Sequence, residues 1–180
     1  MKQCEKCGGR LAMRVVPEYQ HEIVGLPGVV LVDTVEERYC VKCGAVASVL
    51  FPNLPGMIAA IALARVKHRQ KLTGREVRFM REALGWSSTE LAEKLGLDAA
   101  TMSRWENDRQ RIGSASERLL RVMVCEFLAA KAPAINTDLR EVMLMRIEPA
   151  KPRLKPPRIC LRGIDMKIAR RREKVWEEAA

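Results

Sequence analysis

The chain has 180 residues, enough for one ordinary domain or two small ones. Apolar residues make up 48 % and aromatic residues only 4 %, so any core is expected to be mainly aliphatic. The formal net charge of +10 favours a polyanionic partner, and no apolar run is long enough to predict a membrane-spanning helix.

Because the first residues lack the apolar region of a secretory signal, the expected compartment is the cytoplasm. The charge is uneven along the chain. Residues 1–52 carry 6 Lys/Arg and 6 Asp/Glu, whereas residues 151–180 carry 10 Lys/Arg and 4 Asp/Glu. This pattern suggests nucleic acid as the partner, although a basic, solvated surface would have the same composition.

Residues 1–52 are predicted to form strands and turns, because "RLAMRVV", "GVVLVDTVEERYC" and "AVASVLF" are rich in β-branched residues. "GLPG" predicts a turn between two of these strands. "FPNLPG" at 51–56 breaks the pattern and predicts the end of the first domain.

Two C-x2-C pairs lie in this first segment, Cys4 with Cys7 and Cys40 with Cys43, separated by 32 residues. Four thiolates on two tight turns fit the tetrahedral coordination of a structural Zn²⁺, one ion per chain, in a zinc-ribbon-like domain. A disulfide or redox pair and a catalytic zinc are the alternatives. In a cytoplasmic protein, metal ligation is the favoured interpretation.

Helical patterns follow the break. They cover 57–72, 73–85 with Thr73 as the N-cap and Gly85 as the stop, 88–96 capped by Ser87 or Ser88, and 98–107 capped by Asp98. A longer helix is predicted at 114–131 and a further one at 136–147. From Glu148 the Pro-rich and basic chain is expected to be extended, with a terminal helix over 165–180. Cys125 is expected to lie in the core, and Cys160 is expected to be a free thiol without a function in the tail.

The stretch "STELAEKLGLDAATMSRWEN" predicts two short helices joined by a glycine-containing turn, which is a helix-turn-helix. Leu91, Ala92, Met102 and Trp105 have the spacing of its core. The side chains expected to face outward on the second of these helices, toward a DNA major groove, are Ala99, Ala100, Thr101, Ser103, Arg104 and Asn107. Arg109 and Arg111 are expected to contact phosphates. The face carrying Arg75, Arg78 and Arg81 is expected to be solvated.

The segment "LTGREVRFMREALGWSSTELAEKLGLDAATMSRWEN" resembles the lambda-repressor/Cro-type (XRE) helix-turn-helix. With the preceding cysteine pairs, the chain is similar to the MqsA-type antitoxins over roughly residues 1–130. The resemblance implies a DNA-binding homodimer that represses its own promoter, and an N-terminal domain that binds a toxin, often an mRNA-cleaving ribonuclease. It also implies phosphate contacts by Ser88, Thr89 and Ser103, and base or phosphate contacts by Thr101 and Arg104.

The expected fold class is therefore α+β, with a small Cys4 zinc-ribbon-like β domain, an all-α helix-turn-helix domain and a basic tail. The predicted divisions are a zinc-binding domain at 1–52, a connecting helix at 53–72, the helix-turn-helix domain at 73–132 and a dimerisation and basic extension at 133–180.

The expected function is sequence-specific transcriptional regulation from a near-palindromic double-stranded DNA operator, as an autorepressing antitoxin. The alternatives are a repressor without a toxin, and an interaction protein whose zinc domain docks a partner. No arrangement of Ser/His/Asp or paired carboxylates predicts an enzyme. The segment "ARRREK" in the tail could bind DNA, bind a protein or remain solvated.

Overall fold

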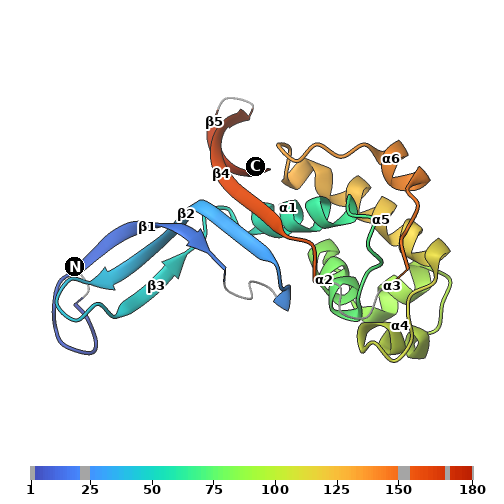
Figure 1. Ribbon diagram of the computed structural model, residues 1–180, viewed down its shortest axis with the longest axis horizontal. Coiled ribbons are helices and arrows are strands. Elements are labelled where there is room, and N and C mark those ends of the chain that lie inside the picture. The colour runs from blue at the N-terminus through green and yellow to red at the C-terminus, as the bar shows by residue number, and fades with distance from the viewer. Residues whose placement is uncertain (1–2, 21–24, 150–154, 169–170, 180) are drawn as a thin grey trace.

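The computed structural model describes residues 3–20, 25–149, 155–168 and 171–179. It is a mixed α+β structure, in which strands carrying the cysteines precede a helical region over residues 54–144, so the expected fold class is confirmed (Figure 1). In the described part of the chain, no helix is long and apolar enough to cross a membrane.

The sheet is built around one long central strand. Its strands are β1 (Leu11–Tyr19), β2 (Val29–Cys40), β3 (Val46–Leu50), β4 (Ile159–Ile168) and β5 (Arg171–Glu178). β1 runs antiparallel along one edge of β2. The other edge of β2 is shared by two strands: its second half pairs antiparallel with β3, and its first half pairs parallel with β4. β5 pairs antiparallel with β4. The cysteine end of β2 therefore lies between β1 and β3.

The C-terminal strands contradict the terminal helix predicted over 165–180. The segment "IDMKI" at 164–168 alternates apolar and polar residues, which is the period of a strand rather than of a helix. Trp176 is fully buried and its Nε1 donates to the carbonyl of Pro52 at 3.0 Å. The tail is thus part of the same sheet as the N-terminal strands, while the four divisions expected from the sequence remain a prediction.

The helices are α1 (Leu54–Val66), α2 (Gly74–Leu84), α3 (Ser88–Lys94), α4 (Ala99–Glu106), α5 (Ser114–Leu128) and α6 (Leu139–Leu144), with a short 3-10 turn at Ala129–Lys131. α2, α3 and α4 begin at the predicted capping residues, whereas the helix predicted at 57–72 runs from Leu54 to Val66 and the one predicted at 136–147 is shorter. Thr73 forms a capping box with Glu76, and Gly85 ends α2 at φ 78°. Ser87 and Asp98 cap α3 and α4.

α1 lies at the centre of the molecule, between the sheet and the other helices (Figure 1). Ten of its thirteen residues are buried, among them the charged residue Arg65. The guanidinium of Arg65 pairs with Glu76 of α2, and Arg121 of α5 pairs with Glu117 at 2.8 Å. Both arginines also donate to carbonyls of the loop 67–71, and Arg121 donates to the carbonyl of Val66 at 2.7 Å, so these two side chains hold the loop and join α1 to α2 and α5.

Candidate nucleic-acid interface and metal site

The four cysteine thiols meet at one end of the sheet. The Sγ atoms of Cys4 and Cys43 are 3.8 Å apart, those of Cys7 and Cys40 are 3.4 Å apart, and all four lie within 4.8 Å of one another. Four sulfurs around one Zn²⁺ at about 2.3 Å would be separated by about 3.8 Å, so these distances suit tetrahedral coordination. The predicted residues thus form a site that could bind a metal ion.

Both C-x2-C pairs lie on the same kind of turn. The N–H of Gly8 donates to the carbonyl of Cys4 at 2.8 Å, and the N–H of Gly44 donates to that of Cys40 at 2.9 Å. Gly8 and Gly44 have φ of 68° and 71°, a left-handed conformation that glycine adopts without strain. The two glycines therefore give both pairs matching geometry, from which the sulfurs converge.

The thiols differ in acidity. A backbone N–H of Cys43 is the main group that lowers the pKa of Cys40, to about 6. The N–H of Gly9 also favours the thiolate of Cys7, but the neighbouring thiols of Cys43 and Cys40, together with burial, outweigh it and raise the pKa of Cys7 to about 12. Of these two thiols, Cys40 is therefore the one that more readily supplies a thiolate to an incoming metal ion.

The helix-turn-helix consists of α3, the turn at Gly96 and α4. Leu91 and Ala92 of α3 and Met102 and Trp105 of α4 are all buried, which confirms the predicted core. Gly96 has a φ of 66°, so the turn uses the left-handed conformation available to glycine. Packing of these four side chains fixes the outer face of α4.

The predicted DNA-contacting residues lie at the start of α3, on the outer face of α4 and in the loop that follows it. Thr101 and Ser88 are half-buried, and the remaining residues are exposed, namely Thr89, Ala99, Ala100, Ser103, Arg104, Asn107, Arg109 and Arg111. The guanidinium of Arg104 donates to the hydroxyl of Thr101 at 2.5 Å and to the side chain of Gln110 at 3.1 Å. These bonds hold Arg104 along the exposed face, where its remaining donors are open to solvent.

The loop after α4 presents a second group of polar side chains. Asn107 donates to the carbonyl of Ser103 at 2.8 Å, and Arg111 pairs with Asp108 at 2.9 Å. Arg109 is exposed, and no described side chain pairs with it. Of the two arginines predicted to contact phosphates, Arg109 is thus the freer cation.

One prediction for α2 is wrong. Arg81 is not solvated, because its side chain is only 13 % exposed and pairs with Glu106 at the end of α4. Arg78 lies 3.5 Å from the same carboxylate, whereas Arg75 is exposed as expected. No local pattern indicates this pairing, since Arg81 and Glu106 lie 25 residues apart.

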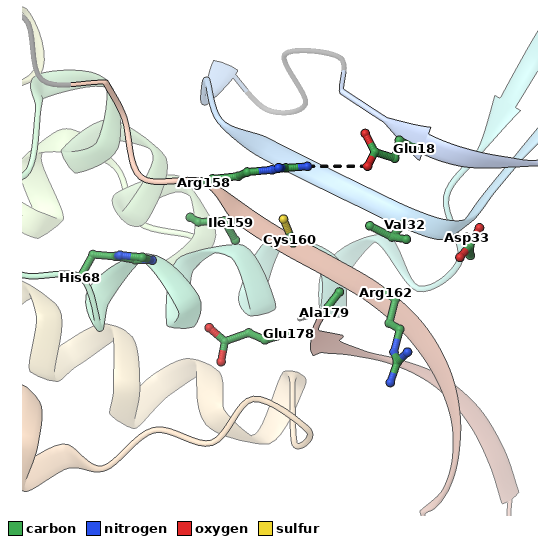
Figure 2. Close-up of a pocket in the computed structure, with 10 residues that line it drawn as sticks. All are labelled: Glu18, Val32, Asp33, His68, Arg158, Ile159, Cys160, Arg162, Glu178 and Ala179. Carbon is green, nitrogen blue, oxygen red and sulfur yellow. Dashed lines mark ion pairs between the residues drawn. The ribbon is translucent and has the colours of Figure 1, made fainter.

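A separate cavity of about 610 Å³ lies between β1, the start of β4 and the end of α1 (Figure 2). Arg158 reaches across it to Glu18 at 3.6 Å, and Cys160 lies on its wall, half-buried. Burial is the main cause that lowers the pKa of His68 at the rim. None of the predicted metal or DNA ligands lies in this cavity, so it is distinct from both sites.

Comparisons with known proteins identify the helix-turn-helix. Residues 72–125 match the family model of a helix-turn-helix domain, a span that begins just before α2 and ends within α5. No curated protein and no solved structure matches the chain. The helix-turn-helix implies DNA binding and indicates a DNA-binding regulator, and the chain also holds a cysteine cluster able to bind a metal ion.

Proposed function

We propose that the protein is a sequence-specific transcriptional regulator that inserts α4 into the major groove of double-stranded DNA. The observation that carries the proposal is the exposed face of α4, where Arg104 is held by Thr101 and Gln110 beside Ser103 and Asn107. Arginine in this position can donate two bonds to guanine, while small hydroxyl groups allow close approach to the backbone. Arg109 then adds a phosphate contact just beyond the helix.

The protein acts as a homodimer on a near-palindromic operator, because one helix-turn-helix contacts few bases. Exposed large apolar side chains on α5 and α6 support this proposal, namely Leu119, Phe127, Leu139, Met143 and Leu144. Exposed apolar groups of this number are typical of a protein interface, and pairing there would fix the spacing of two α4 helices.

The cysteine cluster holds one structural Zn²⁺ per chain. Four sulfur ligands fill the coordination sphere of zinc and leave no position for a substrate, so the metal has no catalytic task. The protein is not an enzyme, and it works in the cytoplasm, where these thiols remain reduced. Neither β1 nor β3 has a buried residue, which makes metal binding the main source of order at this end of the sheet.

The finer proposal is an autorepressing antitoxin whose N-terminal strands bind a toxin. It is supported by a second set of exposed apolar side chains at the cysteine end, namely Met13, Val15, Val41, Val46 and Leu50. A small sheet that exposes so many apolar groups is suited to a protein partner. The alternative is a repressor in which the same surface docks another protein, without a toxin.

Selection of bound duplexes from a random pool tests the main proposal. The full chain should enrich one near-palindromic sequence, and the Arg104→Ala variant should enrich it far less. Enrichment of no sequence by the wild-type chain would refute sequence-specific regulation. Co-expression with the product of an adjacent reading frame tests the antitoxin role, which requires both a stable complex and relief of growth arrest.

A further inference from the structure

The strands β4 and β5 continue as a two-stranded ribbon beyond the sheet. β4 pairs with β2 only from Ile159 to Arg162, and the described residues beyond Gly163 pair with β5 alone. Figure 1 shows this part of β4 and β5 curving away from the helices and from the strands β1 to β3. The base is fixed by the buried side chains of Leu161 and Trp176, so the far end is presented on a rigid support.

The shaft of the ribbon pairs opposite charges. Arg162 faces Glu177 across the strands and bonds to it at 2.6 Å, and Asp165 faces Lys174 with an ion pair of 3.2 Å. Opposite charges at directly facing positions stabilise an antiparallel pair. The cations of the shaft are therefore neutralised within the protein.

The far end of the ribbon breaks this rule. Lys167 directly faces Arg172, whereas Arg171, in the next facing pair opposite Ile168, lies on the other face of the ribbon. All three cations are exposed, and within the described part of the chain none of them has an ion pair. Like charges that face each other across two strands destabilise the pairing. An anion bound between Lys167 and Arg172 would remove this repulsion.

We propose that Lys167 and Arg172 form a second polyanion site, which binds the phosphate backbone of nucleic acid. The choice of nucleic acid rests on the proposed DNA-binding function of α4. A two-stranded ribbon has the dimensions of a DNA groove, and cations on adjacent strands can bind neighbouring phosphates. Residues 169–170 of the basic segment lie outside the described residues and are not part of the site.

The salt dependence of DNA binding tests the site. The probe is a labelled 40-base-pair duplex of random sequence, since phosphate contacts need no operator. Each lost contact lowers the slope of log affinity against log salt by about 0.9, so Lys167→Ala/Arg172→Ala should lower it by about 1.8. Raising the salt from 50 to 200 mM should therefore weaken binding of this double variant by about tenfold less than binding of wild type. The control Lys131→Ala/Arg146→Ala removes the same charge from exposed positions on the helical side and should leave the slope within about 0.5 of wild type.

A second variant separates binding from folding. Lys167→Glu places opposite charges at the facing pair, so its melting temperature should be no lower than that of wild type, while its salt slope falls. An unchanged slope in both ribbon variants, or an equal fall in the control, would overturn the proposal. So would stronger ribbon-dependent binding to phosphatidylserine vesicles or polyglutamate than to the duplex. Absence of any duplex binding by the wild-type chain would instead refute the function proposed for α4.

Discussion

Arg81 of α2 and Glu106 of α4 form an ion pair with 2.5 Å between Nε and Oε1 and 3.3 Å between Nη2 and Oε2. The hydrogen bond to Glu106 is the main cause that raises the pKa of Arg81. Arg81 also donates to the carbonyl of Trp86 at 2.9 Å, just before α3. One side chain thus holds α4 against α2 and fixes the approach to α3, so it sets the orientation of the DNA-contacting helix.

Replacing Arg81 by Met should lower the free energy of unfolding by about 1–3 kcal/mol, because Glu106 would lose a buried partner. Arg75→Met serves as the control, since Arg75 is exposed on the same helix and pairs with no carboxylate among the described residues. Chemical denaturation measures both variants. Removing both partners in Arg81→Met/Glu106→Leu should recover part of the loss. Equal stability of the Arg81 and Arg75 variants would show that the pair does not hold α4.

The cap of α4 makes its stability depend on pH. Asp98 accepts bonds from the hydroxyl and the N–H of Thr101, each at 2.7 Å, and these bonds lower its pKa from 3.8. A carboxyl whose folded pKa is lowered stabilises the folded state above its unfolded pKa, and this contribution is lost as pH falls through the folded pKa. At pH 7, Asp98→Ala should therefore melt at a lower temperature than wild type.

The difference in melting temperature between wild type and Asp98→Ala should then narrow as the pH falls below 3.8. Glu90 needs a separate control, because its bonds to Ser87 at the start of α3 lower its pKa in the same way. In an Asp98→Ala/Glu90→Gln background the remaining dependence on pH should be flatter. A constant difference at every pH would contradict the assigned role of the carboxylate.

Gly163 joins the ribbon to the sheet through one close contact. Its N–H donates to the hydroxyl of Thr34 at 2.6 Å, and a Cβ at this position would overlap the γ-methyl of Thr34. Gly163→Ala should cost about 1–3 kcal/mol of stability through this overlap. Thr34→Ser removes the methyl but keeps the hydroxyl, so the double variant should regain much of the loss. A double-mutant cycle measured by denaturation tests this, and additive losses would contradict it.

Loss of the metal should affect only one end of the sheet. β1 and β3 have no buried residue, whereas Val29, Leu31 and Val35 in the first half of β2 belong to the core. Chelation should therefore speed hydrogen exchange in β1, β3 and the second half of β2, and leave the helices unchanged. Elemental analysis should find one zinc per chain, lost in Cys43→Ser and retained in Cys160→Ser. A metal-free protein with an ordered cysteine end would refute structural zinc.

The sequence predicted the features that depend on neighbouring residues. Caps at Thr73, Ser87 and Asp98 and the two C-x2-C turns are local patterns, and the structure confirms each of them. It did not predict the parallel pairing of β4 with β2, because Ile159 and Val29 lie 130 residues apart and neither segment indicates its partner. The alternation of "IDMKI" at 164–168 could have shown the strand, but the segment from 165 onward was instead predicted to be a terminal helix.

The buried ion pairs were missed for a similar reason. Arg65 lies within an apolar helix, and a lone arginine in such a sequence does not indicate whether it is solvated or paired. Its partner, Glu76, lies three residues after the cap Thr73, as expected of a capping box, but its carboxylate serves both Thr73 and Arg65. When a side chain has both a local and a distant partner, a sequence motif therefore predicts only the local contact.

The most direct test of the account is the affinity of full-length Arg104→Ala for the selected operator, measured by fluorescence anisotropy against Arg140→Ala. Arg140 is exposed on α6, so its replacement removes the same charge away from α4. We predict that Arg104→Ala weakens operator binding by about 1–3 kcal/mol and relaxes discrimination at one base pair. Arg140→Ala should bind like wild type. If both variants bind the operator with wild-type affinity and specificity, α4 does not contact the bases and the central claim is wrong.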